Sequence, residues 1–217
     1  MNDTDFDMPA AMAETLRGRE GAWALVRGFA AHWGEPLTPQ DGFTDAELDA
    51  AEQRLGLRLP TALREAYRLF GRRADLTSSQ DVLLTPDELY VLDGALVYRA
   101  ENQGSAHWGV LLDDLAQADP PTVARPDLAD KSQERWEPWE ERFSTAAAVM
   151  AMSEKLLEDD DLGVFYEADD EIPDGLVELP ALGRDCRWFA GPDVLVLLIE
   201  EAFMVGRART EDALDAL

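Results

Sequence analysis

The sequence predicts an α+β fold, a single domain with a central, largely antiparallel sheet of about five or six strands flanked by helices. The expected elements come in the order helices, strands, helix, strands, helix, unlike the regular alternation that produces parallel sheets. An Asp93-Gly94 pair between two strand-like segments is typical of a tight hairpin turn. The continuous apolar run Val194–Ile199 has the length and composition of a central strand.

The first forty residues are expected to form a helical extension and a linker, ahead of a domain at residues 41–217. Pro36 and Pro39 mark the linker-like break between the two. Apolar residues recur at helical spacing before it, at Trp23, Val26, Ala30 and Trp33.

The best-defined helix of the sequence begins at Thr44. Thr44 and Glu47 have the spacing of a capping box, and Phe43 and Leu48 have the spacing of a hydrophobic staple. Gly56 is placed to end this helix in a left-handed conformation.

A second helix is expected to start at Pro60 and to close at Gly71. Its apolar face is formed by Leu63, Ala66, Tyr67 and Phe70. The polar residues 71–80 that follow are expected to form a loop.

The strands of the middle section are expected at residues 89–92, 96–100 and 108–112. Prolines on both sides of residues 122–124 allow at most an edge strand there. A helix is expected at residues 144–157, with Val149, Met152 and Leu156 on one face.

At the C-terminal end, residues 203–209 can return beside the Val194–Ile199 strand. Thr210 can cap a last short helix, whose first turn carries Glu211 and Asp212, where the helix dipole favours acids. Leu214 and Leu217 are expected to fold back onto the sheet.

Three patches of the sequence share a pattern with one protein family. The first patch comprises Leu55-Gly56-Leu57, Leu59-Pro60, Tyr67, Phe70 and Gly71. The second is Glu101-Asn102-Gln103-Gly104, then, after two residues, His107-Trp108-Gly109-Val110 running into Asp113. The third is Asp119-Pro120-Pro121-Thr122-Val123. In this order they resemble the SUKH superfamily from about residue 43 to the C-terminus, and the resemblance leaves the first forty residues outside it.

The resemblance implies a SUKH-like α+β domain without catalytic activity. Bacterial members of this superfamily act as immunity proteins, which bind and neutralise a cognate toxin. Eukaryotic and viral members act as regulatory scaffolds. The resemblance therefore implies an immunity protein, with a non-catalytic protein-interaction or regulatory scaffold as the alternative.

The charge of the chain is strongly negative, with 45 acidic and 19 basic residues and a formal net charge of −26. Residues 111–217 carry 27 of the acids and 9 of the bases, and the densest cluster lies between Met152 and Glu178. Such a charge repels nucleic acid and acidic lipid and attracts a basic partner. General solubility is the alternative explanation of the net charge.

The remaining composition places the chain in the cytoplasm. A single cysteine, Cys186, allows no internal disulfide, and the first ten residues hold three aspartates and no base, unlike a secretory leader. No apolar stretch reaches the ~18 residues of a membrane helix. The charge disfavours close self-association, so we expect a monomer or a weak dimer.

No pattern of catalytic residues stands out. Ser105 and His107 are close in sequence but lack a nucleophile elbow. Cys186, near Trp188 and Phe189, is expected to be a buried, unreactive thiol. We therefore expect a protein that is not an enzyme and has no cofactor.

A calcium loop starting at Asp170 would need oxygen ligands where Ile172 and Ala181 stand, so no metal site is expected. Adventitious binding of divalent cations by clustered carboxylates is the remaining alternative.

The partner-binding surface is expected at the acids that follow the helix at 144–157. These residues are Glu158, Asp159, Asp160, Asp161, Glu167, Asp169, Asp170 and Glu171. Trp136 and Trp139, which lie among charges, are lesser candidates for an interface hot spot, and the alternative is that they fix their loop on the core.

The predicted function is stoichiometric blockade of a basic, nuclease-type toxin by this acidic surface. A nuclease site is basic because it must hold phosphate, and an acidic face can occupy such a site and exclude the substrate. The expected partner is thus a cognate basic protein toxin, with no nucleic acid and no membrane.

Overall fold

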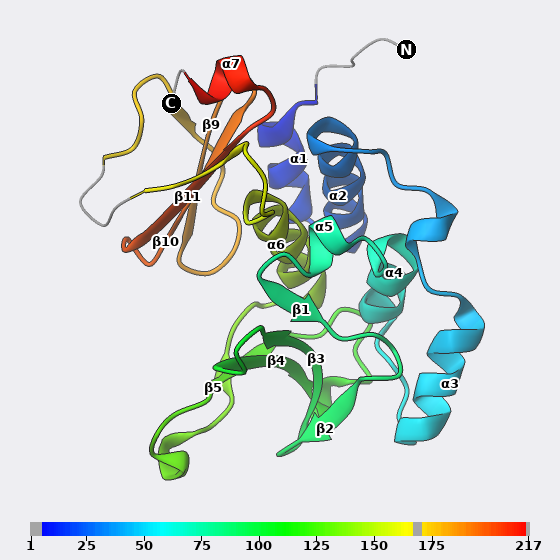
Figure 1. Cartoon of the computed structure of the whole chain (residues 1–217). Coiled ribbons are helices and arrows are strands. Elements are labelled where there is room, and N and C mark those ends of the chain that lie inside the picture. The colour runs from blue at the N-terminus through cyan, green and yellow to red at the C-terminus, as the bar shows by residue number, and fades with distance from the viewer. Residues whose placement is uncertain (1–5, 167–170, 216–217) are drawn as a thin grey trace.

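The computed structural model, which describes residues 6–166 and 171–215, contains two antiparallel sheets with helix α6 (Phe143–Leu156) between them (Figure 1). The α+β class and the antiparallel pairing are confirmed. The strands expected in one central sheet are divided between two, and this corrects the single-sheet expectation.

The first sheet has the strand order β1-β3-β4-β5-β6, and β2 also pairs with β3. Its strands are β1 (Asp81–Leu83), β2 (Tyr90–Leu92), β3 (Ala95–Glu101), β4 (Ala106–Leu111), β5 (Val123–Pro126) and β6 (Glu137–Pro138). Asp93-Gly94 joins β2 to β3 with both residues at positive φ, as the sequence predicts. β5 is not the edge strand that was expected, because β6 pairs with its far side.

The second sheet has the strand order β7-β11-β10-β9-β8. Its strands are β7 (Gly163–Phe165), β8 (Val177–Glu178), β9 (Cys186–Gly191), β10 (Val194–Ile199) and β11 (Phe203–Ala208). The antiparallel β10–β11 pair agrees with the sequence prediction. One face of this sheet packs on α6 through Leu195, Leu197 and Val205, and the other carries a small cluster around Val196 and Met204.

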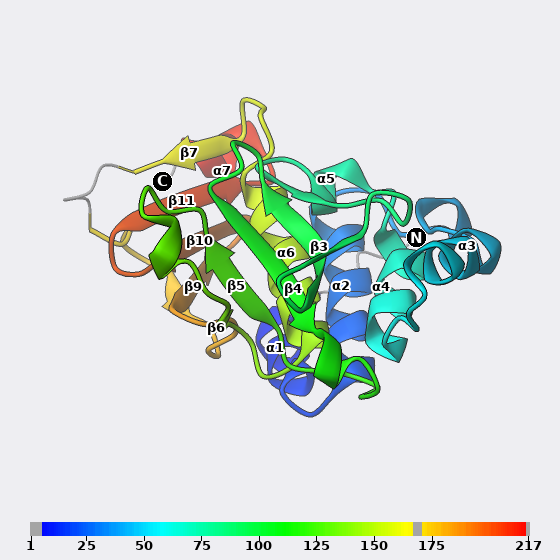
Figure 2. The same ribbon diagram turned by 90° about the horizontal axis from the view of Figure 1, so that it is seen from below.

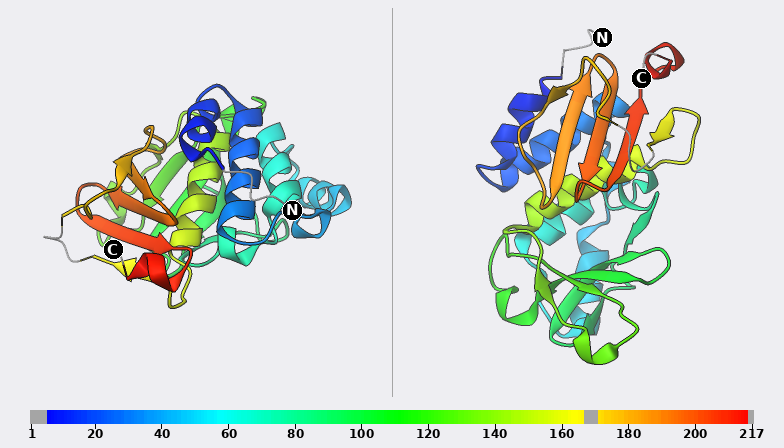
Figure 3. Two further views of the ribbon diagram at one scale, coloured as in Figure 1. Left: turned by 90° about the horizontal axis from the view of Figure 1, so that it is seen from above. Right: turned by 90° about the vertical axis from the view of Figure 1, so that its left-hand side faces the viewer.

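Helix α6 explains why there are two sheets. All but one of its residues are buried, so the helix is covered around its whole circumference. A helix of this kind needs packing partners on every side. Tyr98 of β3 contacts Phe143 with ring centroids 5.0 Å apart, while the second sheet and α2 cover other sides of α6 (Figure 3).

Apart from α7, the other helices gather beside α6 and extend to α3 at the margin of the molecule (Figures 1 and 2). They are α1 (Met8–Thr15), α2 (Arg19–Trp33), α3 (Asp45–Leu55), α4 (Thr61–Phe70) and the short α5 (Ala74–Thr77); α7 (Glu211–Leu214) follows β11. Short 3-10 turns occur at η1 (Pro39–Asp41), η2 (Leu112–Asp114) and η3 (Lys131–Gln133). In the described part of the chain no helix is long and apolar enough to cross a membrane.

The helical extension predicted for the first forty residues belongs to the main core. Trp23, Val26, Ala30 and Trp33 are all buried, and they share one cluster with α4 and α6. The predicted capping box of α3 is present, with Glu47 N–H donating to Thr44 Oγ1 at 3.3 Å, and Gly56 ends α3 at φ +68°. Residues 71–80, expected as a loop, include α5.

A buried ionic cluster joins α6 to the first sheet. The Glu154 side chain is fully buried and accepts hydrogen bonds from Arg99 Nη2 at 2.5 Å and from the backbone N–H of Gln80 at 2.7 Å. Arg99 Nη2 also lies 2.9 Å from Asp81 Oδ2, and its guanidinium stacks on Trp108. The cluster therefore fixes β1 and β3 on the helix.

Candidate protein-interaction surface

The second sheet and its connections form an acidic unit. Within residues 158–166 and 171–215 there are fourteen acidic residues and four arginines. Each arginine is already in an ion pair within this unit: Arg184 with Asp185, Arg187 with Glu178, Arg207 with Glu158 and Asp160, and Arg209 with Asp193. The excess acids therefore keep a negative field over this end of the molecule.

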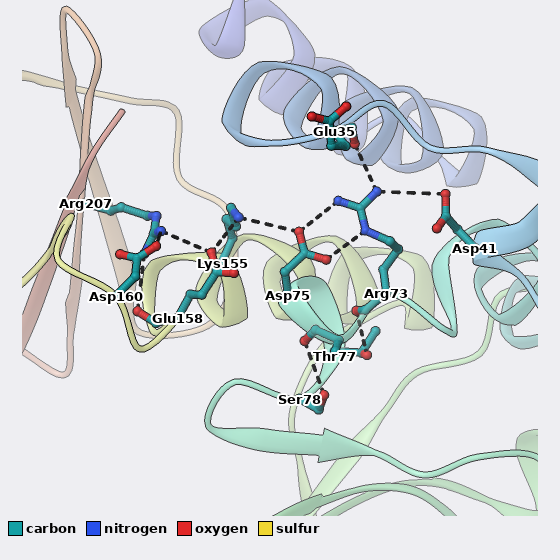
Figure 4. A network of polar contacts seen from close by, with 11 residues as sticks. Glu35, Asp41, Arg73, Asp75, Thr77, Ser78, Lys155, Glu158, Asp160 and Arg207 are labelled. Atoms are coloured by element: carbon teal, nitrogen blue, oxygen red, sulfur yellow. Dashed lines mark hydrogen bonds and ion pairs between the residues drawn. The ribbon is translucent and has the colours of Figure 1, made fainter. Parts of the chain in front are cut away.

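Two of the predicted contact residues, Glu158 and Asp160, are fixed by basic groups (Figure 4). Arg207 of β11, with a side chain only 4% exposed, contacts Asp160 and places Nη2 3.1 Å from Glu158 Oε2. Lys155 Nζ lies 2.6 Å from the same Glu158 oxygen. Glu158 and Asp160 thus stabilise the turn after α6, and their role in partner binding stays a prediction.

The electrostatics of Asp160 agree with this role. Burial opposes its charged form, but the backbone N–H of Leu162 and the Arg207 guanidinium hold its pKa below the usual value. The carboxylate stays charged and bound, so it contributes little to attracting a partner.

Asp159, Asp160, Asp161 and Glu171 are the predicted residues that the structure leaves exposed, and of these Asp160 is bound by Arg207. Asp159 and Asp161 flank the bound Asp160, so successive carboxylates alternate between solvent and the Arg207 contact. The other three predicted acids, Glu167, Asp169 and Asp170, lie outside the described residues. Asp159 and Asp161 are therefore the exposed carboxylates of this turn that Arg207 does not bind.

The two candidate tryptophans are half-buried and packed on the first sheet. Trp136 Nε1 donates a hydrogen bond to the carbonyl of Leu92 at 3.2 Å. Trp139 contacts Trp108 edge-to-face, with ring centroids 6.3 Å apart. These contacts fix their loop on the core, which was the alternative drawn from the sequence, and a part in an interface stays a prediction.

An exposed aromatic pair that the sequence prediction missed lies beside the acids. Phe165 of β7 is 65% exposed and Phe203 of β11 is 43% exposed, with ring centroids 6.3 Å apart. Two aromatic residues in strands give no sign of exposure in the sequence. The one available signal is Glu200-Glu201, which is separated from Phe203 by Ala202 alone and places a charged turn next to the ring.

A cleft of about 760 Å³ lies elsewhere, between the N-terminal helices and β8, β9 and β10. Its carboxylates, Glu178 and Asp193, are bound by Arg187 at 2.8 Å and Arg209 at 2.6 Å. Both are therefore held as ion pairs rather than as a free acid and base.

The other groups considered for chemistry have structural partners. His107 Nδ1 lies 3.3 Å from the hydroxyl of Tyr90, and the Ser105 N–H donates to Glu101. Burial, with smaller contributions from Glu140 and Asp185, raises the pKa of Cys186 to about 11, which makes it a poor nucleophile. Within residues 6–166 and 171–215, no three His, Cys, Asp or Glu side chains form a group that could hold a metal ion.

Comparison with known proteins found no relative of this chain. No protein-family model, no curated protein and no solved structure matches the chain.

Proposed function

We propose that this protein is a cytoplasmic immunity protein of the SUKH type, which neutralises a basic, nuclease-type toxin by binding it. The observation that carries the proposal is the acidic unit, in which all four arginines are internally paired and the excess carboxylates face solvent. A surface of this kind attracts a basic protein and repels nucleic acid. The SUKH-like sequence patches support the same class of protein.

The mechanism is occupation of the toxin's phosphate-binding cleft. Such a cleft must present lysine and arginine to the nucleic acid backbone. Asp159, Asp161 and the other exposed acids take the place of the phosphates, and the bulk of the second sheet excludes the substrate. Inhibition is stoichiometric and requires no turnover by the immunity protein.

The test is a pull-down with the tagged protein in lysate of its own organism, eluted by a salt step and identified by mass spectrometry. Recovery of a basic toxin domain at one-to-one stoichiometry supports the proposal. Recovery of signalling or cell-wall enzymes in its place would favour the regulatory scaffold, the second function that the resemblance implies.

A further inference from the structure

The second sheet has a free edge at β7. The backbone N–H of Tyr166 donates to the carbonyl of Met204 at 3.2 Å, so Tyr166 is one of the residues that hydrogen-bond to β11. Because alternate residues of an antiparallel strand face opposite sides, Gly163 and Phe165 direct their N–H and C=O groups away from β11. No other strand of the described residues pairs with β7 there.

The free edge lies next to the exposed aromatic pair. Phe165 is itself one of the two residues with outward-facing backbone groups, and the ring of Phe203 packs beside it. A partner strand at this edge would therefore gain backbone hydrogen bonds and apolar burial at one place. Natural edge strands are usually protected from such pairing by charges.

Acids border this edge at both ends. Asp161 precedes Gly163 by two residues, and Glu200 and Glu201 form the turn that leads into Phe203. Both glutamates have positive φ, 52° and 54°, a conformation that favours asparagine or glycine in such hairpin turns. Two glutamates thus occupy this turn against their backbone preference, and such strained positions cluster at functional sites.

We propose that a β-strand of the partner protein pairs with the free edge of β7, and that this strand carries lysine or arginine on both sides of an apolar centre. The apolar centre covers Phe165 and Phe203, and the basic residues face Asp161 and the Glu200-Glu201 turn. This inference rests on the proposed function, because it names the surface that holds the basic partner.

The test uses two short synthetic peptides of equal charge with lysines at both ends, one with a central run of valines and one with prolines in place of the valines. Proline cannot donate the backbone hydrogen bonds of a ladder, so only the first peptide can extend the sheet. Affinity is measured by NMR titration at low salt, and hydrogen exchange of individual amides is followed in the full-length protein.

The proposal predicts that the lysine–valine peptide binds at least tenfold more tightly and slows exchange of the Gly163 and Phe165 amides. Phe165→Ala should weaken this binding by about tenfold. Val177→Ala should leave it unchanged, because Val177 is 68% exposed on β8, the opposite edge of the same sheet, and so is a matched control.

Equal affinity for the two peptides, or protection of the β8 amides instead, would overturn the strand pairing while leaving an acidic surface that binds basic proteins. Absence of binding by either basic peptide would contradict the proposed function as well. The two failures are therefore distinguishable.

Discussion

Glu154 and Lys155 are consecutive residues of α6, yet they bind opposite parts of the molecule. Glu154 accepts hydrogen bonds from Arg99 of β3, in the first sheet, and from the backbone N–H of Gln80, which immediately precedes β1. Lys155 contacts Glu158, which Arg207 of the second sheet also binds, and lies 3.5 Å from Asp75 of α5 (Figure 4). One end of α6 therefore fixes both sheets and, through Glu158, the start of the acidic unit.

Arg207→Met should destabilise the protein by about 2 kcal/mol, because it leaves the carboxylates of Glu158 and Asp160 without their partly buried partner. Arg187→Met is the matched control, since the Arg187–Glu178 pair is about half exposed on both sides. It should cost much less than Arg207→Met, because solvent screens this pair. Urea unfolding measures both, and equal losses would show that the Arg207 contacts are not structural.

Asp81→Asn should stabilise the protein near pH 8 by about 1–3 kcal/mol and have little effect near pH 4. Burial raises the pKa of Asp81 to about 6. Arg99 acts in the opposite direction, and the nearby charge of Glu154 adds to the increase. The folded state therefore binds more protons than the unfolded state between pH 4 and 6, and stability is lost as the pH rises through this window. Asparagine has no charge to bury, so it removes that loss of stability, and Arg99 remains paired with Glu154. Thermal unfolding of both proteins across pH 4–8 checks this, and parallel curves would contradict it.

The double variant Glu200→Asn, Glu201→Gly should stabilise the protein by about 1–3 kcal/mol, because both residues have the positive φ that asparagine and glycine tolerate. The same variant should bind a basic partner less tightly, since it removes two acids beside Phe203. Denaturant unfolding and a binding titration are measured on one preparation. A loss of stability would contradict the turn geometry.

Local signals in the sequence were sufficient for much of the fold. The capping box at Thr44 and the turn at Asp93-Gly94 depend on neighbouring residues only, and both are present. The division into two sheets depends on how α6 is covered, which is a tertiary property. β9 was not predicted, because Cys186–Gly191 mixes polar and apolar residues without strict alternation and becomes a strand by pairing with β10.

The candidate surface was predictable only in its charge. The sequence indicates that residues 158–161 are acidic, but the pairing of Asp160 with Arg207, distant in the sequence, requires the fold. The exposure of Phe165 and Phe203 also follows from their place at the margin of the second sheet. Trp136 looked equally suited to an interface, and its contact with Leu92 could not be deduced from its neighbours.

Asp159→Lys with Asp161→Lys should weaken binding of a basic partner by at least tenfold and reduce its salt dependence, with little change in stability. Both side chains are exposed, whereas the same change at Asp160 would break the Arg207 contact. The control is Glu20→Lys with Asp113→Lys, which gives the same net charge at exposed positions outside the acidic unit. Equal binding by the two double variants would remove Asp159 and Asp161 from the interface.

The most direct test of the account is to titrate the nuclease activity of the toxin domain recovered in the pull-down with the purified protein. Stoichiometric blockade predicts a linear loss of activity that reaches zero at one equivalent, together with a shift of this endpoint or residual activity for the Asp159→Lys, Asp161→Lys variant. Full activity at excess inhibitor, or complete inactivation by a small fraction of an equivalent, would contradict stoichiometric blockade.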